Sequence, residues 1–515
     1  MEVGPWRMDS TGELREIEGG WEEYANIVYV DQPVGTGFSY GSTDRYATEL
    51  TESTPQMIEF MRNFYKVFPE LAGIDTYLAG ESFAGQYIPY IADAMLKASN
   101  MPAPLRGIAI GNGWIDSRAQ YPAYVEFGLK AGLFKENSNE HKHAKKKLAE
   151  CEASLDKLPS SFEPVGDAVC EHVMGAVLEP FNKEVNGRQT CMNVYDIRLT
   201  DDYPACGMNW PPDLKQITPW LRKKPVVISL HAEAKDAAWT ECSGRVGSIM
   251  SNKKSPSSVT LLPGLLEKIS VMLFAGDQDV ICNYVGQEKL LERLRWGGAV
   301  GMGNAESLPW TVNGTAAGTW QTARNMTYVK IFKGSHMVGW DLPHVVHDMI
   351  LRFMNVDFGR ITTGTAGRIP SSLGDTPKET PLPGGGTLSD LELKAKWQGA
   401  PRLFHLLVKA ILTEIVLGPT LTAYYNAGTV ALIVVLIAVS IGTVLYCRSR
   451  RNVGPSRIVL RDDNANGTTE ESIPLTLSSD ESRRRKGKGR AIPEPIEEEE
   501  EIFEIGSDGE EKYPS

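Results

Sequence analysis

The stretch from Thr76 to Tyr90 constrains this chain most, because it has the pattern of a strand, a tight turn bearing a serine, and a helix. Small residues around Ser82 let the backbone turn sharply and lift the hydroxyl clear of a sheet, beside a helix N-terminus. Ala84 stands where the usual G-x-S-x-G pattern has its last glycine, and an ordinary turn serine is the alternative. We expect a nucleophile elbow at Ser82.

Strands alternate with amphipathic helices on both sides of this elbow. Such alternation predicts an α/β fold with a parallel sheet, whose active groups lie at the carboxyl ends of the strands. The alternation stops between about residues 117 and 265, a helical, charged segment that we interpret as an inserted cap. The expected strands are 25–30, 76–79, 105–110, 270–275 and 326–332, and the expected helices outside the elbow are 49–68, 285–296 and 343–354.

Polar turns follow the last two of these strands. One presents Asp277 and Asp279, and the other presents His336. A serine hydroxyl needs a base to take its proton and an acid to orient that base. Singly, such an aspartate is usually a turn former and such a histidine is usually structural. Ser82, Asp279 and His336 nevertheless follow the chain order of an α/β-hydrolase triad, so we predict that they act together.

Charge and cysteine content exclude some classes of function. The formal net charge of −12 argues against nucleic-acid binding, which needs clustered Lys and Arg on a folded face. The seven cysteines form no C-x-x-C pair and lack histidines at zinc-ligand spacing, so no metal site is predicted. Four of them suit two disulfides in an oxidising compartment, with three possible connectivities. These are Cys151, Cys170, Cys191 and Cys206.

Residues 427–447 form an uncharged, apolar run long enough to cross a hydrocarbon core of about 30 Å, with a buried core helix as the alternative. Arginines follow this run, so the positive-inside rule places the C-terminus in the cytosol. Residues 358–426 have the composition of a lumenal linker or stalk that is not expected to pack, and the polar tail 448–515 is expected to be disordered. Because no signal-peptide pattern follows Met1, we expect a delivery segment upstream of it.

These motifs resemble those of the serine carboxypeptidases, a peptidase group with the α/β-hydrolase fold. The elbow Gly80–Tyr87 is similar to the family's G-E-S-[YF]-A-G-x-Y, which accounts for Ala84. The resemblance covers residues 1–357 and implies an α/β-hydrolase sheet with an inserted helical cap and no cofactor. The other similar segments are Asp31–Tyr40, Ile110–Gly113, Ala275–Asn283 and Gly334–Met337.

The resemblance also implies the roles of the site residues. Ser82 would be the nucleophile, His336 the base and Asp279 the orienting acid. The Phe83 backbone N–H would be one donor of the oxyanion hole.

Two glutamates, Glu81 and Glu2, resemble the pair that binds the substrate's terminal carboxylate in this family. A carboxyl binds a carboxylate only by donating a proton, so such a pair needs burial and like-charge proximity to stay protonated. Affinity should therefore fall as pH rises, and acidic working conditions are expected. Cys282 resembles the family's unpaired cysteine near the triad, and Met337 resembles a residue of the leaving-group pocket. Buried apolar filler is the alternative for both.

One family motif has no counterpart here. Family members carry an N-G-G-P-G-C-S-S loop just before the segment that matches Met1–Pro5, and that loop supplies a carboxylate-binding asparagine, the second oxyanion donor and a disulfide partner. We therefore expect the early strands to be missing and Cys242 to be unpaired. Loss of an oxyanion donor lowers the rate by about 10²–10³-fold. An incomplete gene model is favoured over a defective product.

The stalk, single span and acidic tail resemble, within this family, the membrane-anchored pheromone-processing carboxypeptidases of the fungal late Golgi. That resemblance implies removal of C-terminal Lys and Arg from secretory precursors after kexin-type cleavage, and a tail that binds cytosolic sorting machinery. Residues 399–423 are interpreted as a retained intervening sequence. Asn313 and Asn325 begin lumenal glycosylation sequons, whereas the Asn466 sequon lies beyond the span.

Three functions remain open at this point. A membrane-tethered serine exopeptidase for basic C-terminal residues, located in the trans-Golgi network, is the principal hypothesis. An acyltransferase or esterase on the same scaffold is the second, although Glu2 and Glu81 argue against it. A catalytically impaired tethered adaptor is the third, and the missing oxyanion loop supports it.

Overall fold

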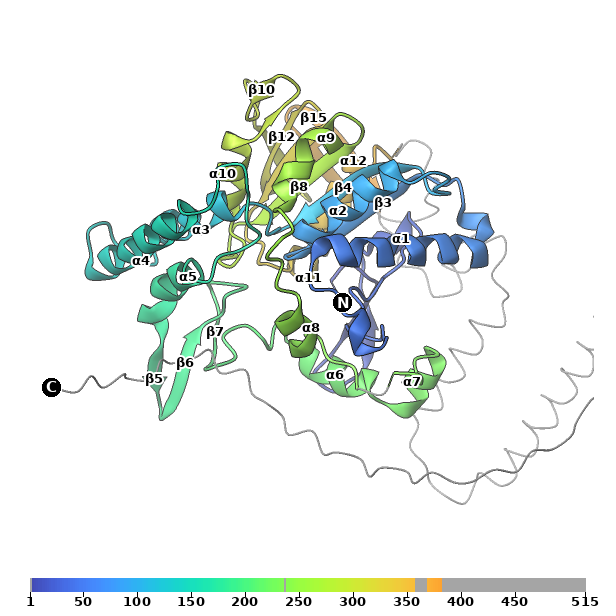
Figure 1. Ribbon diagram of the computed structural model, residues 1–515, viewed down its shortest axis with the longest axis horizontal. Coiled ribbons are helices and arrows are strands. Elements are labelled where there is room, and N and C mark those ends of the chain that lie inside the picture. Colours follow the sequence, from blue (N-terminus) through green and yellow to red (C-terminus); the bar gives the residue numbers. More distant parts are fainter. Residues whose placement is uncertain (1, 236–237, 357–367, 382–515) are drawn as a thin grey trace, which may run out of the picture. The chain divides into compact units, whose positions relative to one another are not determined.

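An eight-stranded sheet forms the centre of the computed structural model, which describes residues 2–235, 238–356 and 368–381 (Figure 1). The strands, in spatial order, are β15 Thr376–Pro381, β14 Arg368–Leu373, β11 Leu308–Val312, β12 Thr315–Ala323, β13 Met326–Ile331, β8 Ser270–Gly276, β4 Leu105–Gly111 and β3 Thr76–Glu81. β3, β4, β8 and β13 pair in parallel, and β12, β11, β14 and β15 continue the sheet in antiparallel pairs.

The parallel strands end in register. Glu81 lies opposite Gly111, and Gly111 lies opposite Phe274. Gly276 in turn lies opposite Ile331. The turns that follow β3, β4, β8 and β13 therefore lie together at the carboxyl ends of the strands. Catalytic and ligand-binding side chains gather at these ends in α/β folds.

Helices cover both faces of this sheet. Side chains alternate along a strand, so Val271 and Leu273 of β8 join the core formed with α1 (Leu50–Val67) and α2 (Ala84–Lys97). Met272 and Phe274 join the opposite core, which includes residues of α12 (Pro343–Phe353). Burial on both faces explains why β8 is a continuous apolar run.

The expected α/β class is confirmed by these elements. The predicted strands 76–79, 105–110, 270–275 and 326–332 correspond to β3, β4, β8 and β13. The predicted helices 49–68, 285–296 and 343–354 correspond to α1, α10 (Tyr284–Arg293) and α12. The boundaries differ by a few residues at most.

The predicted strand 25–30 is wrong. Among the described residues no strand pairs with this segment, and Val28 and Tyr29 are exposed. A strand needs a neighbour for its backbone N–H and C=O groups, which apolar, β-branched residues alone do not supply. The preceding residues instead form a hairpin of β1 (Trp6–Met8) and β2 (Leu14–Glu16).

The segment between β4 and β8 contains the predicted helices and also a small sheet that the sequence did not indicate. α3, α4 and α5 lie with β5, β6 and β7 on one side of the central sheet, at the left of Figure 1. The helices of the segment between β4 and β8 are α3 Ser117–Lys130, α4 Asn139–Leu155, α5 Glu171–Leu178, α6 Leu214–Leu221, α7 Lys224–Ser229, α8 Gly244–Ile249 and α9 Leu262–Leu266. The strands of this segment are β5 Lys183–Val185, β6 Arg188–Met192 and β7 Thr200–Asp202.

Two disulfides cross-link residues within this segment. Cys151 pairs with Cys170 and Cys191 pairs with Cys206, which selects one of the three connectivities left open by the sequence. Cys242 is free, as expected, and so is the buried Cys282.

Part of the predicted linker is ordered, which corrects the expectation that it does not pack. Residues 368–381 form β14 and β15, and β14 pairs with β11. Ser371 is buried, donates to Asp348 Oδ1 at 2.7 Å and accepts from Arg352 Nη2 at 2.6 Å, so polar contacts hold this hairpin on the sheet. No helix in the described ranges has the length and apolar character of a membrane span. The predicted span 427–447 and tail 448–515 lie outside these ranges.

Candidate active site

The short connection between β3 and α2 forms the predicted elbow. Ser82 has φ of 59°, in the left-handed region that non-glycine residues rarely adopt. A Cβ at Gly85 would lie 2.6 Å from Trp114 O, so only glycine fits there. The Ser82 backbone N–H donates to Gly111 O at 3.0 Å, and Ser82 O accepts from the Trp114 N–H at 2.9 Å. The turn is therefore fixed against the end of β4.

Asp279 and His336 meet in the turns after β8 and β13. Asp279 Oδ2 lies 2.8 Å from His336 Nδ1, and both side chains are buried. His336 Nε2 lies 3.8 Å from Glu81 Oε1, so this nitrogen faces the elbow. An imidazole held at Nδ1 by a carboxylate can exchange a proton through Nε2. Asp277, the other candidate, instead accepts from the Lys333 N–H at 2.7 Å.

Asn112 is a partner of Asp279 that sequence reasoning missed. Its Nδ2 donates to Asp279 Oδ2 at 2.7 Å, and its Oδ1 accepts from the Gly276 N–H at 3.1 Å. Asp279 also accepts from the N–H groups of Ile281 at 3.1 Å and Cys282 at 3.2 Å. The available signal was the position of Asn112, which lies two residues after the predicted strand 105–110, at the strand ends where the triad was expected.

Cys282 lies at the candidate nucleophile, since its side chain shares a hydrogen bond with Ser82. Burial raises the pKa of the Cys282 thiol well above its usual range, and the charges of Asp279 and Glu81 raise it further. A raised pKa favours the neutral thiol, which is a poor nucleophile.

Glu81, directly before Ser82, shares a side-chain hydrogen bond with Glu2. Burial raises the pKa of Glu81 well above its usual range, and the charge of Glu2 and that hydrogen bond raise it further. Arg7 Nη2 donates to Glu2 O at 2.7 Å and to Gly339 O at 3.2 Å, which ties this N-terminal segment to the chain just after His336. A protonated carboxyl in this position can donate a hydrogen bond to an anionic carboxylate.

Phe83 and Met337 directly follow two of the candidate catalytic residues, Ser82 and His336. Phe83 is the N-cap of α2, and its backbone N–H has no hydrogen-bond acceptor within the described part of the chain. Such an N–H is available to an oxyanion. Met337 directly follows His336, is partly buried, and precedes α11 (Val338–Asp341).

The two sequon asparagines lie in turns away from the triad. Asn313 is exposed in the turn between β11 and β12, and Asn325 is exposed in the turn between β12 and β13. Asn325 Nδ2 donates to Leu266 O at 2.9 Å.

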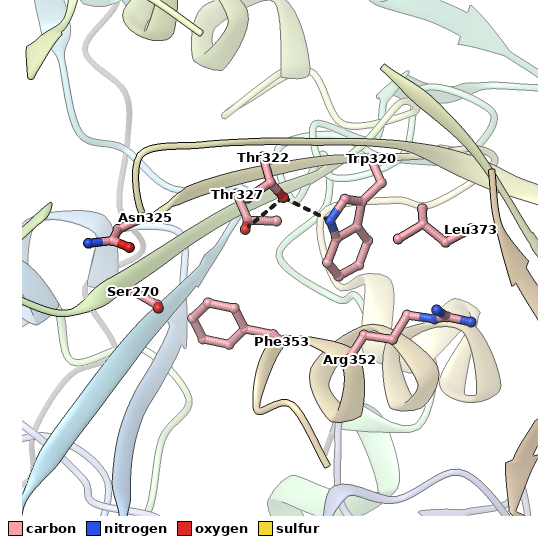
Figure 2. Close-up of a pocket in the computed structure, with 8 residues that line it drawn as sticks. All are labelled: Ser270, Trp320, Thr322, Asn325, Thr327, Arg352, Phe353 and Leu373. Carbon is pink, nitrogen blue, oxygen red and sulfur yellow. Dashed lines mark hydrogen bonds between the residues drawn. The ribbon is translucent and has the colours of Figure 1, made fainter. Parts of the chain in front are cut away.

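A pocket of about 360 Å³ lies at the amino ends of the parallel strands β8 and β13 (Figure 2). It is lined by Ser270, the first residue of β8, and by Thr327 near the start of β13, whereas the turns that carry Asp279 and His336 follow the ends of these strands. Inside it, Thr322 Oγ1 accepts from Trp320 Nε1 at 3.1 Å and lies 3.2 Å from Thr327 Oγ1. No triad residue lines this pocket.

Sequence comparison shows which proteins the chain is similar to. The family profile described as serine carboxypeptidase matches residues 1–356. The chain is 46% identical over 536 residues to the pheromone-processing carboxypeptidase KEX1 of Coprinopsis cinerea, covering 100% of this chain and 81% of the relative. It is 41% identical to the protein of the same name from Cryptococcus gattii, covering 95% of this chain and 74% of the relative.

Structural comparison agrees with this. The crystal structure of Kex1Δp, a prohormone-processing carboxypeptidase from Saccharomyces cerevisiae, is similar with a TM-score of 0.64 at 32% identity, covering 69% of this chain and 79% of that chain. The sheet and its helices thus form an α/β-hydrolase-like fold. The chain belongs to the serine carboxypeptidase family and is a serine-type carboxypeptidase.

Proposed function

We propose that the chain removes C-terminal Lys and Arg from secretory precursors after an endoprotease has cut them, at the membrane of the late Golgi. The names of the relatives, which are pheromone-processing carboxypeptidases, support this class of substrate. The apolar run 427–447 supports the membrane location, with the catalytic part on the lumenal side and the tail 448–515 available to cytosolic sorting machinery.

The proposed mechanism assigns Ser82, His336 and Asp279 to the triad. His336 takes the Ser82 proton as the hydroxyl attacks the carbonyl of the last peptide bond, and Asp279 stabilises the imidazolium. The imidazolium then gives its proton to the leaving amine, and water hydrolyses the acyl-enzyme. The Phe83 N–H donates to the oxyanion.

The hydrogen bond between Glu81 and Glu2 is the observation that carries the exopeptidase proposal. It lies beside the candidate nucleophile and base, and burial keeps a carboxyl there protonated. A free terminal carboxylate is charged and therefore accepts from such a donor more strongly than the neutral carbonyl of an ester or an internal peptide bond. Cys282 and Met337 would line the adjoining pocket for the departing residue.

An acidic side chain near this pair supports a preference for basic residues. Partial burial and, to a smaller extent, the charge of Glu2 together raise the pKa of Glu241 from 4.5 to about 7, so the two carboxyls are close enough to interact. A Lys or Arg side chain beside Glu241 would favour its ionised form. Glu241→Gln is expected to lower the preference for a C-terminal Arg over Leu by about 10-fold, the effect of one hydrogen bond to a charged group. An unchanged preference would remove Glu241 from the proposal.

The main test is incubation of the purified protein with a peptide ending in Lys-Arg. Release of free Arg and then Lys is expected, with no release by a folded Ser82→Ala variant and none from the same peptide with an amidated C-terminus. A folded wild-type protein that releases neither residue would exclude the exopeptidase hypothesis and favour the hypothesis of a catalytically impaired adaptor. Transfer of the acyl group to an added amine in preference to water would favour the acyltransferase.

The membrane organisation needs a separate test. We propose a catalytic domain at 1–357 with a cap at about 117–265, a lumenal stalk at 358–426, and one span at 427–447. The protein should resist extraction by alkaline carbonate, and in sealed vesicles protease should remove a C-terminal tag but leave the catalytic domain intact. Extraction by carbonate, or protection of the tag, would contradict this organisation.

A further inference from the structure

Tyr195 contacts the candidate base in two ways. Its ring stacks on the His336 imidazole, with 4.8 Å between ring centroids and 29° between the planes. Its carbonyl oxygen accepts the His336 backbone N–H at 2.8 Å. Tyr195 belongs to residues 193–197, here called the clamp loop, which form part of the connection between β6 and β7 in the inserted segment. An element far from His336 in the sequence therefore touches both its ring and its backbone.

The clamp loop also holds the candidate acid. The Ile197 N–H donates to Gln278 O at 3.0 Å, and Val194 O accepts from the Val280 N–H at 3.3 Å. Gln278 and Val280 are the two chain neighbours of Asp279. The loop is thus hydrogen-bonded on both sides of the acid as well as to the base.

The shape of the clamp loop is itself fixed by local contacts. The Cys191–Cys206 disulfide closes the chain around it, and the Val194 N–H donates to Cys206 O at 2.9 Å. The buried Asn193 side chain accepts the Tyr195 N–H at 2.9 Å. These contacts set the position from which Tyr195 reaches His336.

We propose that Tyr195 is a positioning residue for His336, and that the clamp loop, closed by Cys191–Cys206, keeps the base and the acid in register. This inference rests on the roles proposed above for His336 and Asp279. A single hydrogen bond at Nδ1 leaves the imidazole free to tilt, whereas an aromatic face packed against the ring restricts that tilt. The restriction matters because Nε2 must stay within a fraction of an ångström of its productive position.

The first test compares Tyr195→Leu, which removes the ring, with Tyr195→Phe, which keeps it. Tyr195→Leu is expected to lower kcat by roughly 10- to 100-fold with little change in KM, because misplacement by about 1 Å has an effect of this size. Tyr195→Phe is expected to stay within about 3-fold of the wild type, because the stacked ring remains. A rise in KM at unchanged kcat would make Tyr195 a wall of the substrate pocket and overturn the proposal.

The second test uses the two disulfides as a matched pair. Cys191→Ala/Cys206→Ala and Cys151→Ala/Cys170→Ala each open one disulfide of similar sequence separation, 15 and 19 residues, so similar losses of thermal stability are expected. Only the first is expected to lower kcat, by about 10-fold or more, at a temperature where both variants are folded. Equal values of kcat in the two variants would contradict the clamp.

The wild-type activity measured alongside separates the two proposals. An inactive, folded wild-type protein would contradict the proposed function. An active wild-type protein together with an equally active, folded Tyr195→Leu variant would contradict the positioning role alone.

Discussion

Asn112 and Asp279 are joined by a hydrogen bond of 2.7 Å, from Asn112 Nδ2 to the same Asp279 oxygen that faces His336. Asn112 therefore fixes the carboxylate from the β4 side, while the base contacts it from the β13 side. Asn112→Ala removes a buried donor from Asp279, so we expect kcat to fall by about 10-fold, the effect of one hydrogen bond to a charged group. Steady-state kinetics on a peptide with a free C-terminus measure this.

Asn283→Ala is the matched control for Asn112→Ala. Asn283 is also buried, but its Oδ1 accepts the Gly286 N–H at 3.0 Å and caps α10. We expect its loss to cost about 1 kcal/mol of unfolding free energy and to leave kcat within a few-fold of the wild type. If both variants lose kcat equally, Asn112 acts through general packing and not through Asp279.

The convergence of the turns that carry Ser82, Asp279 and His336 was predictable, whereas the contacts that support these turns were not, and the reason is physical. Ser82, Asp279 and His336 each follow a strand, so their meeting at one sheet edge follows from the alternation of strands and helices. Asn112 also follows a strand, but an asparagine between two glycines is ordinarily a turn residue. Its partner is defined only once β4 and β8 pair in register.

Other features depended on contacts that a local pattern does not contain. Tyr195 lies in a segment without strand–helix rhythm, and its stacking on His336 depends on how the inserted segment packs. Ser371 lies in a sequence with linker composition, yet it is buried, because Asp348 and Arg352 supply hydrogen-bond partners for its hydroxyl. The segment 25–30 has strand composition but no pairing strand among the described residues. Tertiary context overrides propensity in each case.

Substrate affinity is expected to fall as pH rises, because of Glu81. Burial, the charge of Glu2 and their shared hydrogen bond raise the pKa of Glu81. The protonated form therefore persists above the usual range and is lost as pH rises through the raised value. The ionised form repels a terminal carboxylate, so KM should rise from acidic to neutral pH. Glu81→Gln keeps a donor at every pH and should flatten this rise.

Glu288→Gln is the control for Glu81→Gln. Burial also raises the pKa of Glu288, which lies on α10 and pairs with Lys330 at 3.8 Å. Its substitution should leave the pH dependence of KM unchanged. The role of Glu81 as proton donor is excluded if KM of Glu81→Gln still rises with the wild-type profile.

The buried pair of Glu23 and His347 is expected to make folding stability depend on pH. Glu23 Oε2 lies 3.2 Å from His347 Nε2. Burial raises the pKa of Glu23 from 4.5 to about 8, so its contribution to stability is lost as pH rises toward 8. Burial lowers the pKa of His347 from 6.5 to about 4, so its contribution is lost as pH falls toward 4.

These two contributions oppose each other between pH 4.5 and 6.5, and only that of Glu23 changes between pH 6.5 and 8. The melting temperature should therefore vary little over the first interval and fall over the second. Glu23→Gln should remove the fall, because an amide does not titrate. Thermal unfolding followed across this range measures the effect, and a variant as pH-sensitive as the wild type would assign the fall to other groups.

Glycosylation at Asn313 and Asn325 tests the lumenal placement of the catalytic domain. Both asparagines have positive φ, 51° and 69°, in two-residue hairpin turns, and both are exposed. Asn313→Gln and Asn325→Gln are each expected to lose one glycan and therefore to migrate faster on a gel than the wild type. This difference in mobility should vanish after enzymatic deglycosylation. Asn466→Gln should change nothing, because its sequon lies beyond the proposed span. A mobility shift in Asn466→Gln, or none in the other two, would contradict the proposed topology while leaving the geometry around Ser82 unaffected.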